Sequence, residues 1–255
     1  MASTVLEVDR LCKSFGGVHA IRDLSFTLSE GEILGLIGPN GSGKSTTVNA
    51  LAGVYPATSG NIRLAGAAIE TLPEYARVAK GLARTFQTAS NFTEITVRQQ
   101  VRLACNVTLK THPAASIFGF GAVSTEAAEI SERVDKILQM TSLAEIANDR
   151  VGAISSAEQR FLMIATALAA EPKAILLDEP AAGLIANERS GLAELIRAIR
   201  DAGTAVLVIE HHMGLIMEVC DRIVVLNFGA KIAEGTPAEI RNDQAVIDAY
   251  LGEAA

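Results

Sequence analysis

A glycine-rich run near the N-terminal end limits the possible folds of this chain more than any other segment. Residues 38–46 read Gly-Pro-Asn-Gly-Ser-Gly-Lys-Ser-Thr and fit the pattern G-x-x-x-x-G-K-[ST]. An apolar stretch at 32–37 has the character of a buried strand, and the stretch at 47–52 suits a helix. Strand, glycine loop and helix in this order are the setting that a phosphate-binding loop requires. The pattern therefore predicts a nucleoside triphosphate site.

The residue types of this loop explain why it suits phosphate. Glycines permit backbone angles and close approaches that side chains would block. The exposed amides and the N-terminus of the following helix then attract an anion. Lys44 would place a charge on the outer phosphates, and the Ser45 hydroxyl would ligate Mg²⁺. We expect the nucleotide to be bound by Gly38, Pro39, Asn40, Gly41, Ser42, Gly43, Lys44, Ser45 and Thr46.

Composition restricts the remaining possibilities. The 255 residues are 49% hydrophobic, enough for one large domain or for a core with a subdomain. No apolar run approaches the ~18 residues of a membrane span, and no signal segment is evident, so we expect a cytoplasmic protein. A net charge of −7 without a long basic run argues weakly against nucleic acid as a partner. The three scattered cysteines are expected to be thiols.

The pattern of elements indicates an α/β fold. In the first 70 residues we expect antiparallel strands at 5–10, 21–28 and 61–64 beside the strand–loop–helix unit. The middle of the chain should be mainly helical, with a strand at 82–87, helices at 73–80, 93–106, 125–140 and 157–170, a short helix or turn at 142–147 and an irregular insertion at 108–124. Strands at 174–177, 204–209 and 223–226 then alternate with helices at 186–201 and 212–220, and a helical tail follows at 238–251. Such alternation predicts parallel strands with helical crossovers.

Two acids at the end of an apolar strand form a second constellation. Asp178 and Glu179 follow the strand at 174–177. A carboxylate at a strand end beside a phosphate loop is suited to hold Mg²⁺ through water. The adjacent carboxylate can polarise a water for attack on the γ-phosphate. Two solvated acids at a strand end are the alternative reading.

A histidine pair ends the next apolar strand. His211 could contact the γ-phosphate or the attacking water, because ligands bind at the carboxyl ends of parallel strands. The alternative is an ordinary surface or core histidine. Since His211 and His212 are consecutive, their side chains should point apart, and we expect only one of them to serve.

Taken in order, these motifs make the chain resemble the ATP-binding subunit of ABC transporters. The resemblance rests on Phe15, the loop at 38–46, Gln87 in Arg-Thr-Phe-Gln, the segment 175–180 and His211. Finer features look like the branched-chain amino acid importer group; they lie at 84–87, 179–184, 209–211, 234–237 and 249–253.

The resemblance implies an α/β fold with a P-loop NTPase core, in which helices flank a mostly parallel sheet. An N-terminal antiparallel β-subdomain and an inserted helical subdomain would complete it. The expected divisions are 1–87 for the core with the β-subdomain and phosphate loop, 88–157 for the helical subdomain, 158–237 for the rest of the core and 238–255 for the tail.

The resemblance also implies an activity and partners. The chain would bind and hydrolyse ATP with Mg²⁺ and couple closure of a dimer to a membrane permease. Phe15 would stack on adenine, unless it is a core residue, and Gln87 would reach Mg²⁺ or the attacking water, unless it is an ordinary strand-end amide. The chain's direct partners would be integral membrane permease subunits and a second ATP-binding subunit, identical or similar. An indirect partner would be a periplasmic or extracellular solute-binding protein. The subunit would sit on the inner face of the membrane.

One segment departs from the family. The family signature Leu-Ser-Gly-Gly-Gln, which caps the γ-phosphate bound to the opposite subunit, corresponds here to residues 154–158, Ile-Ser-Ser-Ala-Glu. Ser155 and Ala157 would contact that nucleotide, but Ala157 adds a methyl group and Glu158 adds a negative charge. Ile185 stands where the family has Asn or Asp. This departure suggests a regulatory subunit that binds ATP and hydrolyses little, unless a shifted register or relaxed geometry keeps the segment functional. A soluble ATPase of the same family, acting in DNA repair or translation and not in transport, is a separate alternative.

Overall fold

The chain divides into two units with separate interiors. A computed structural model describes residues 3–85, 92–105 and 120–251. The first unit comprises Met1–Gln87 with Lys173–Ala255, and the second comprises Thr88–Pro172.

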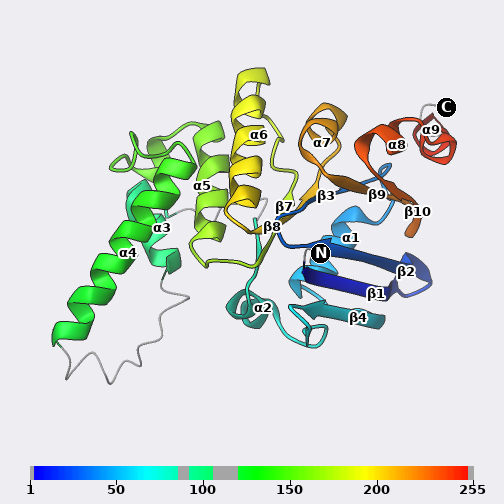
Figure 1. The fold of residues 1–255 in the computed structure, drawn as a ribbon, viewed down its shortest axis with the longest axis horizontal. Helices are drawn as coiled ribbons and strands as arrows, with labels where there is room; N and C mark the ends of the chain where they lie inside the picture. The colour runs from blue at the N-terminus through cyan, green and yellow to red at the C-terminus, as the bar shows by residue number, and fades with distance from the viewer. Residues whose placement is uncertain (1–2, 86–91, 106–119, 252–255) are drawn as a thin grey trace. The chain divides into compact units, whose positions relative to one another are not determined.

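A six-stranded sheet forms the centre of the first unit (Figure 1). Its strands, in spatial order, are β10 (Ala230–Gly235), β9 (Arg222–Asn227), β3 (Ile33–Ile37), β8 (Ala205–Ile209), β7 (Ala174–Asp178) and β6 (Leu82–Arg84). All neighbours pair in parallel except β10, which is antiparallel to β9. Every residue of β3, β7 and β8 is buried, as expected where both faces of a parallel sheet are covered. The mostly parallel sheet predicted from sequence is confirmed.

Parallel pairing brings the carboxyl ends of the central strands to one edge. Asp178 lies opposite Ile209, so the residues that follow β7 and β8 are neighbours. The loop after β3 leaves from the same edge, because β3 lies between β8 and β9. Topology therefore gathers at one edge three segments that are far apart in the sequence.

A second sheet of four strands packs in the same unit. Its order is β2 (Val18–Ser29), β1 (Thr4–Phe15), β4 (Ser59–Leu64) and β5 (Ala67–Ala68). β1 and β2 are longer than predicted, and Phe15 pairs with Val18 across a tight turn. Register shifts interrupt their pairing, and Arg10 and Asp23 have positive φ angles of 46° and 48°. These irregularities break the alternation from which we judged strand length.

Helix α1 (Lys44–Ala52) joins the two sheets into one core. Val48 and Leu51 are fully buried in a cluster that includes Leu6 of β1 and Leu207 of β8. The other helices of this unit are α2 (Glu74–Lys80), α6 (Ala186–Asp201), α7 (Met213–Val219), α8 (Pro237–Arg241) and α9 (Gln244–Leu251). α6 packs against β8 and α7. The core thus fixes the phosphate-loop helix from both sides.

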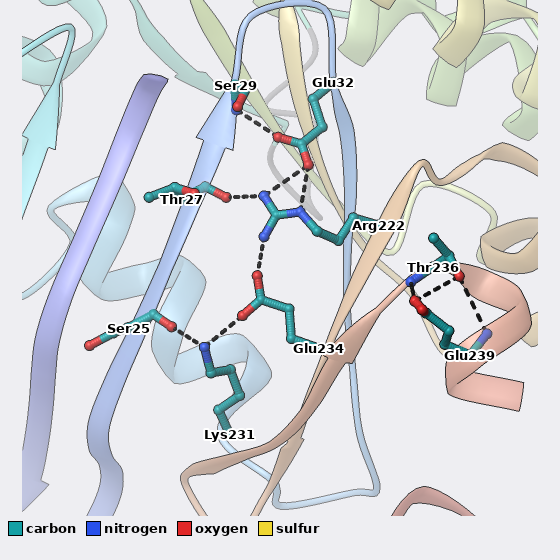
Figure 2. A network of polar contacts seen from close by, with 9 residues as sticks. All are labelled: Ser25, Thr27, Ser29, Glu32, Arg222, Lys231, Glu234, Thr236 and Glu239. Atoms are coloured by element: carbon teal, nitrogen blue, oxygen red, sulfur yellow. Dashed lines mark hydrogen bonds and ion pairs between the residues drawn. The ribbon is translucent and has the colours of Figure 1, made fainter. Parts of the chain in front are cut away.

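A polar network at Arg222 of β9 ties the two sheets together (Figure 2). Its guanidinium donates to the carboxylate of Glu32, which directly precedes β3, and to the carbonyl oxygen of Thr27 in β2. It also donates to Glu234 of β10. Lys231 in turn bridges Glu234 and the carbonyl of Ser25. Burial alone lowers the pKa of Arg222, but hydrogen bonds and charge from Glu32 and Glu234 outweigh burial and raise it.

The second unit is helical, as predicted. It contains α3 (Val97–Cys105), α4 (Phe120–Met140) and α5 (Ser156–Leu168), with a short 3₁₀ turn at Val151–Ala153. Val101, Val134 and Leu162 are buried in one cluster to which all three helices contribute. Because α5 packs here, the second unit reaches Pro172, whereas we expected the helical subdomain to end at 157.

Two further predicted boundaries were wrong, and one strand was missed. The helix expected from 125 begins at Phe120, inside the segment taken as irregular because of its glycines. The tail expected as one helix is two, since Asn242 caps α8 before α9 starts at Gln244. Strand β10 was not predicted, because its residues are only partly buried. In the described part of the chain, no helix has the length and apolar character to cross a membrane.

Candidate nucleotide-binding site

A pocket of about 450 Å³ opens at the carboxyl edge of the large sheet. The loop after β3 forms its floor, and residues from β2, the β9–β10 turn and the ends of β7 and β8 form its walls. Its lining residues are Val18, His19, Ala20, Arg22, Asn40, Gly41, Ser42, Gly43, Lys44, Ser45, Thr46, Glu179, His211 and Phe228. The structure therefore brings seven of the nine predicted loop residues together with Glu179 and His211.

Close backbone contacts explain two of the glycines. Gly38 has φ +152°, and a Cβ there would lie 2.2 Å from the carbonyl oxygen of Leu226. Gly43 has φ +106°, and a Cβ there would lie 2.6 Å from the carbonyl oxygen of Ala20. The amide of Gly229 also donates to the carbonyl oxygen of Ser42 at 2.9 Å. The loop is thus held against β2 and the β9–β10 turn at positions where other residues would clash.

Lys44 begins α1 and is held by the loop itself. Its ammonium donates to the carbonyl oxygens of Gly38 and Pro39, at 2.6 and 2.9 Å. Gly38 and Pro39 do not line the pocket, so their contribution is to position this ammonium. The residue is 8% exposed yet lines the pocket, which places a positive charge at the floor.

Asp178 ends β7 as a buried carboxylate, 3% exposed. Its Oδ2 accepts from Nη2 of Arg84 at 2.8 Å, and Nη1 of Arg84 donates to Oδ1 of Asn49 at 2.6 Å. Among the described residues, Oδ1 of Asp178 has no hydrogen-bond partner. This spare oxygen and the exposed Ser45 hydroxyl fit a hard divalent cation such as Mg²⁺, which prefers oxygen ligands and retains bound water.

Glu179 and His211 face each other across neighbouring strand ends. Oε1 of Glu179 lies 3.6 Å from Nδ1 of His211, and both side chains are partly exposed to the pocket. The amide of Glu179 donates to the carbonyl of Ile209 at 2.9 Å, and Glu179 has a positive φ of 48°. A non-glycine residue in this conformation is strained, and such strain concentrates at functional sites. The two side chains can therefore act on the same atoms.

His212 has a structural role as the N-cap of α7. Its Nδ1 accepts a hydrogen bond from the amide of Leu215 at 3.3 Å and so caps α7. As expected for consecutive residues, one histidine reaches the pocket and the other does not.

Phe15 does not line the pocket. Its ring packs edge-on against Tyr55, with 5.3 Å between centroids, and the ammonium of Lys13 lies 4.8 Å from each ring centre. Phe15 is 47% exposed, so a face remains accessible.

Sequence reasoning missed the residues that β2 and the β9–β10 turn contribute to the pocket, among them Arg22 and Phe228. Phe228 is 75% exposed and has a positive φ of 45°. In the sequence, the only sign of this contribution is an aromatic residue directly before Gly229. It could be recognised as part of a turn between strands only if β10 had been predicted.

The signature segment belongs to the second unit. Ser155 is the N-cap of α5: its Oγ accepts from the amide of Glu158 at 3.2 Å, and its own amide donates to Oε2 of Glu158 at 2.6 Å. This reciprocal pair is a capping box, which satisfies two amides of the helix terminus. Ala157 lies in the first turn of the same helix. The carboxylate of Glu158 thus lies over the helix N-terminus, where an anion would otherwise bind.

Two other predicted positions have simpler outcomes. Gln87 lies outside the described residues. Ile185 is 64% exposed at the start of α6, where its amide donates to Oε2 of Glu188 at 2.8 Å.

Comparison with known proteins agrees with this geometry. The chain matches the ABC transporter family over residues 21–182 and the family described as branched-chain amino acid ATP-binding cassette transporter over residues 230–255. It is 40% identical to the high-affinity branched-chain amino acid transport ATP-binding protein BraF of Pseudomonas aeruginosa and 41% identical to LivG of Salmonella typhimurium, each over 100% of both chains.

The fold is also similar to that of a solved structure. The ADP conformation of MJ1267, an ATP-binding cassette of an ABC transporter, superposes with a TM-score of 0.84 at 28% identity and covers 98% of this chain and 99% of that one. The resemblance and fold class predicted from sequence are therefore confirmed. The chain belongs to the ABC transporter family, as one of its ATP-binding, ATP-hydrolysing subunits.

Proposed function

We propose that this chain is the motor subunit of an importer for branched-chain amino acids. One observation carries the proposal: about 40% identity, over the whole of both chains, to two proteins named for branched-chain amino acid transport. The match of the C-terminal segment to the branched-chain family supports it independently, because that segment lies outside the region of the general family match.

In this proposal the pocket binds ATP through the loop after β3. Loop amides and the N-terminus of α1 cradle the phosphates, and the ammonium of Lys44 neutralises charge on the outer ones. Ser45 and Asp178 would hold Mg²⁺, with Gln87 as a further proposed ligand. When bound, Mg²⁺ supplies positive charge to the β- and γ-phosphates.

Glu179 is the proposed general base. Its carboxylate can accept a proton from a water that attacks the γ-phosphate, since it lines the pocket beside the phosphate loop. His211, 3.6 Å from it, holds the carboxylate and the γ-phosphate in a common arrangement. The positive φ at Glu179 destabilises the folded chain slightly, and in return it holds the carboxylate of the base in position before ATP binds.

The base of the nucleotide would stack on an aromatic ring. Phe15 remains our proposed adenine contact, through its accessible face. Phe228, which lines the pocket, is proposed as a second contact on the base or ribose.

The remaining partners are proposed from the relatives. Permease subunits would bind the helical unit at the inner face of the membrane, and a periplasmic or extracellular binding protein would deliver the solute. A second ATP-binding subunit would complete each site with its signature segment.

A regulatory subunit is the second candidate function. The observation that favours it is the capping box of Ser155 and Glu158, which places a carboxylate where a partner's γ-phosphate would bind. Such a subunit would hydrolyse ATP in its own pocket only when a partner supplies a signature segment free of this charge.

Reconstitution tests the proposed function. The chain, tagged and purified with its membrane partners from the source cells, is placed in proteoliposomes with binding protein and ATP. We expect ATP-dependent uptake of labelled leucine, isoleucine or valine, and no uptake with the Glu179→Gln chain. Active ATP hydrolysis with uptake of none of the three would contradict the substrate class and leave the ATPase assignment intact.

A further inference from the structure

Glu210 is a buried carboxylate between the two strand ends that carry Glu179 and His211. It follows β8 directly and is 1% exposed. Its Oε1 accepts from the amide of Ala181 at 2.7 Å. Its Oε2 accepts from the amides of His211 and His212 at 3.2 and 3.3 Å. One side chain thus contacts the backbone of both catalytic segments.

The contact with Ala181 continues the pairing of β7 and β8 beyond their last residues. The strands pair up to Asp178 and Ile209, and the amide of Glu179 then donates to the carbonyl of Ile209 at 2.9 Å. Two residues further on, the Ala181 amide donates to the Glu210 carboxylate and not to a backbone carbonyl. The turn that follows Glu179 is therefore tied to the turn that contains His211.

A buried carboxylate is costly unless its oxygens are satisfied. Here backbone amides satisfy both oxygens, and among the described residues no Lys or Arg side chain is hydrogen-bonded or ion-paired to it. An apolar residue would leave these three amides without this acceptor, and Ala181 is only 7% exposed. Hydrogen bonds to an ionised carboxylate are stronger than neutral ones, so they hold the two backbone segments more firmly than a neutral acceptor would.

We propose that Glu210 is a positioning residue, which sets the distance between Glu179 and His211 by holding both backbone segments. Glu210 does not line the pocket, so this role is exercised through the backbone that it holds. The inference rests on the roles proposed above for Glu179 and His211, and it adds that their 3.6 Å separation is maintained by a third side chain. An error of about 1 Å in such a pair is enough to lower the rate of a chemical step about 100-fold.

Glu210→Gln is the direct test, in the complete transporter complex. Glutamine has the same shape, but its NH₂ group donates, so one of the two sides loses its acceptor. We expect turnover to fall at least about tenfold while the Kd for ATP changes less than about twofold, because the phosphate loop is untouched. Glu210→Asp keeps the charge but is one methylene shorter, and we expect it also to lower turnover without changing the Kd for ATP. It serves as the test if Glu210→Gln does not fold.

Glu239→Gln is the matched control. Glu239 also accepts a hydrogen bond from a backbone amide, that of Thr236 at 2.7 Å (Figure 2). It lies in α8 and is not among the residues that line the pocket. We expect wild-type turnover from this variant. A similar loss in both variants would mean a general effect on folding and would overturn the proposal.

A double-mutant cycle separates positioning from mere stability. Because Glu210 acts partly through His211, Glu210→Gln should cost less in a His211→Ala chain than in the wild type. Full turnover of Glu210→Gln, or strictly additive losses, overturns the inference. The Glu179→Gln variant distinguishes failure of the positioning role from failure of the proposed site. If Glu179→Gln is inactive while Glu210→Gln has normal turnover, only the positioning role of Glu210 is wrong. If Glu179→Gln is active, the proposed catalytic site itself is wrong.

Discussion

The guanidinium of Arg84 is paired with the buried carboxylate of Asp178 at 2.8 Å, and the side chains are 12% and 2% exposed. This pair joins β6 to β7 and, through Asn49, to the phosphate-loop helix. Removing one member leaves a buried, uncompensated charge, which costs far more than a surface pair contributes.

Arg84→Met should therefore destabilise the nucleotide-free chain by about 3 kcal/mol. The Arg84→Met/Asp178→Asn chain should be more stable than the sum of the two single changes predicts, because the second change removes the unpaired charge. Denaturant unfolding of all four chains measures both effects. Additive destabilisation would mean that the pair is not coupled energetically.

Phe228 should contribute to nucleotide affinity through the base. Phe228→Ala is expected to weaken ATP binding about fivefold and to leave tripolyphosphate binding unchanged, since base–aromatic stacking is worth about 1–3 kcal/mol and only ATP has a base. Tyr75→Ala, which alters an equally exposed aromatic residue outside the pocket lining, is the control. Calorimetric titration with both ligands decides. Loss of ATP affinity in Phe15→Ala but not in Phe228→Ala would assign the base contact to Phe15 alone.

The charge of Glu158 should oppose ATP-driven dimerisation. Glu158→Gln keeps an oxygen acceptor for the Ser155 amide, so the cap survives while the negative charge is removed. In a Glu179→Gln background, which traps ATP, we expect this change to strengthen self-association about fivefold, consistent with the ~1 kcal/mol of a charge at a helix N-terminus. Light scattering with and without ATP measures it. Unchanged association would show that the carboxylate does not face the partner's phosphate.

Arg222 should be important for stability and not for nucleotide binding. Arg222→Met leaves Glu32, 13% exposed, without its cationic partner and removes the polar links between the two sheets. The change should cost about 2 kcal/mol and lower Tm by ~4–8 °C. Arg197→Met, whose ion pair with Glu218 is largely exposed, should change Tm little. Thermal unfolding compares them. An equal, small effect of both would contradict a structural role for the network.

The sequence allowed the fold and the floor of the pocket to be predicted, because both depend on local patterns. The loop at 38–46 and the two acids at the end of β7 carry their chemistry in adjacent residues. The apolar runs that become β3, β7 and β8 are buried on both faces. What could not be predicted depends on contacts between distant segments. Phe228 reaches the pocket only because β10 pairs with β9, and Arg84 meets Asp178 only because β6 pairs with β7.

Glu210 shows the same limit in one residue. In the sequence it was a polar residue before a histidine, and nothing adjacent indicated that it would be buried. Its partner Ala181 is 29 residues away. Parallel pairing of β7 with β8 makes it a link between the segments that carry Glu179 and His211.

The central claim is that Glu179 on this chain is the base for hydrolysis of ATP bound at its own phosphate loop. Single-turnover hydrolysis of radiolabelled ATP by the assembled complex, with wild-type and Glu179→Gln chains, tests it most directly. We predict a loss of at least about 100-fold in the hydrolysis rate, as expected for removal of a general base, with the Kd for ATP within about twofold of wild type. Hydrolysis by the Glu179→Gln complex at the wild-type rate would contradict the account.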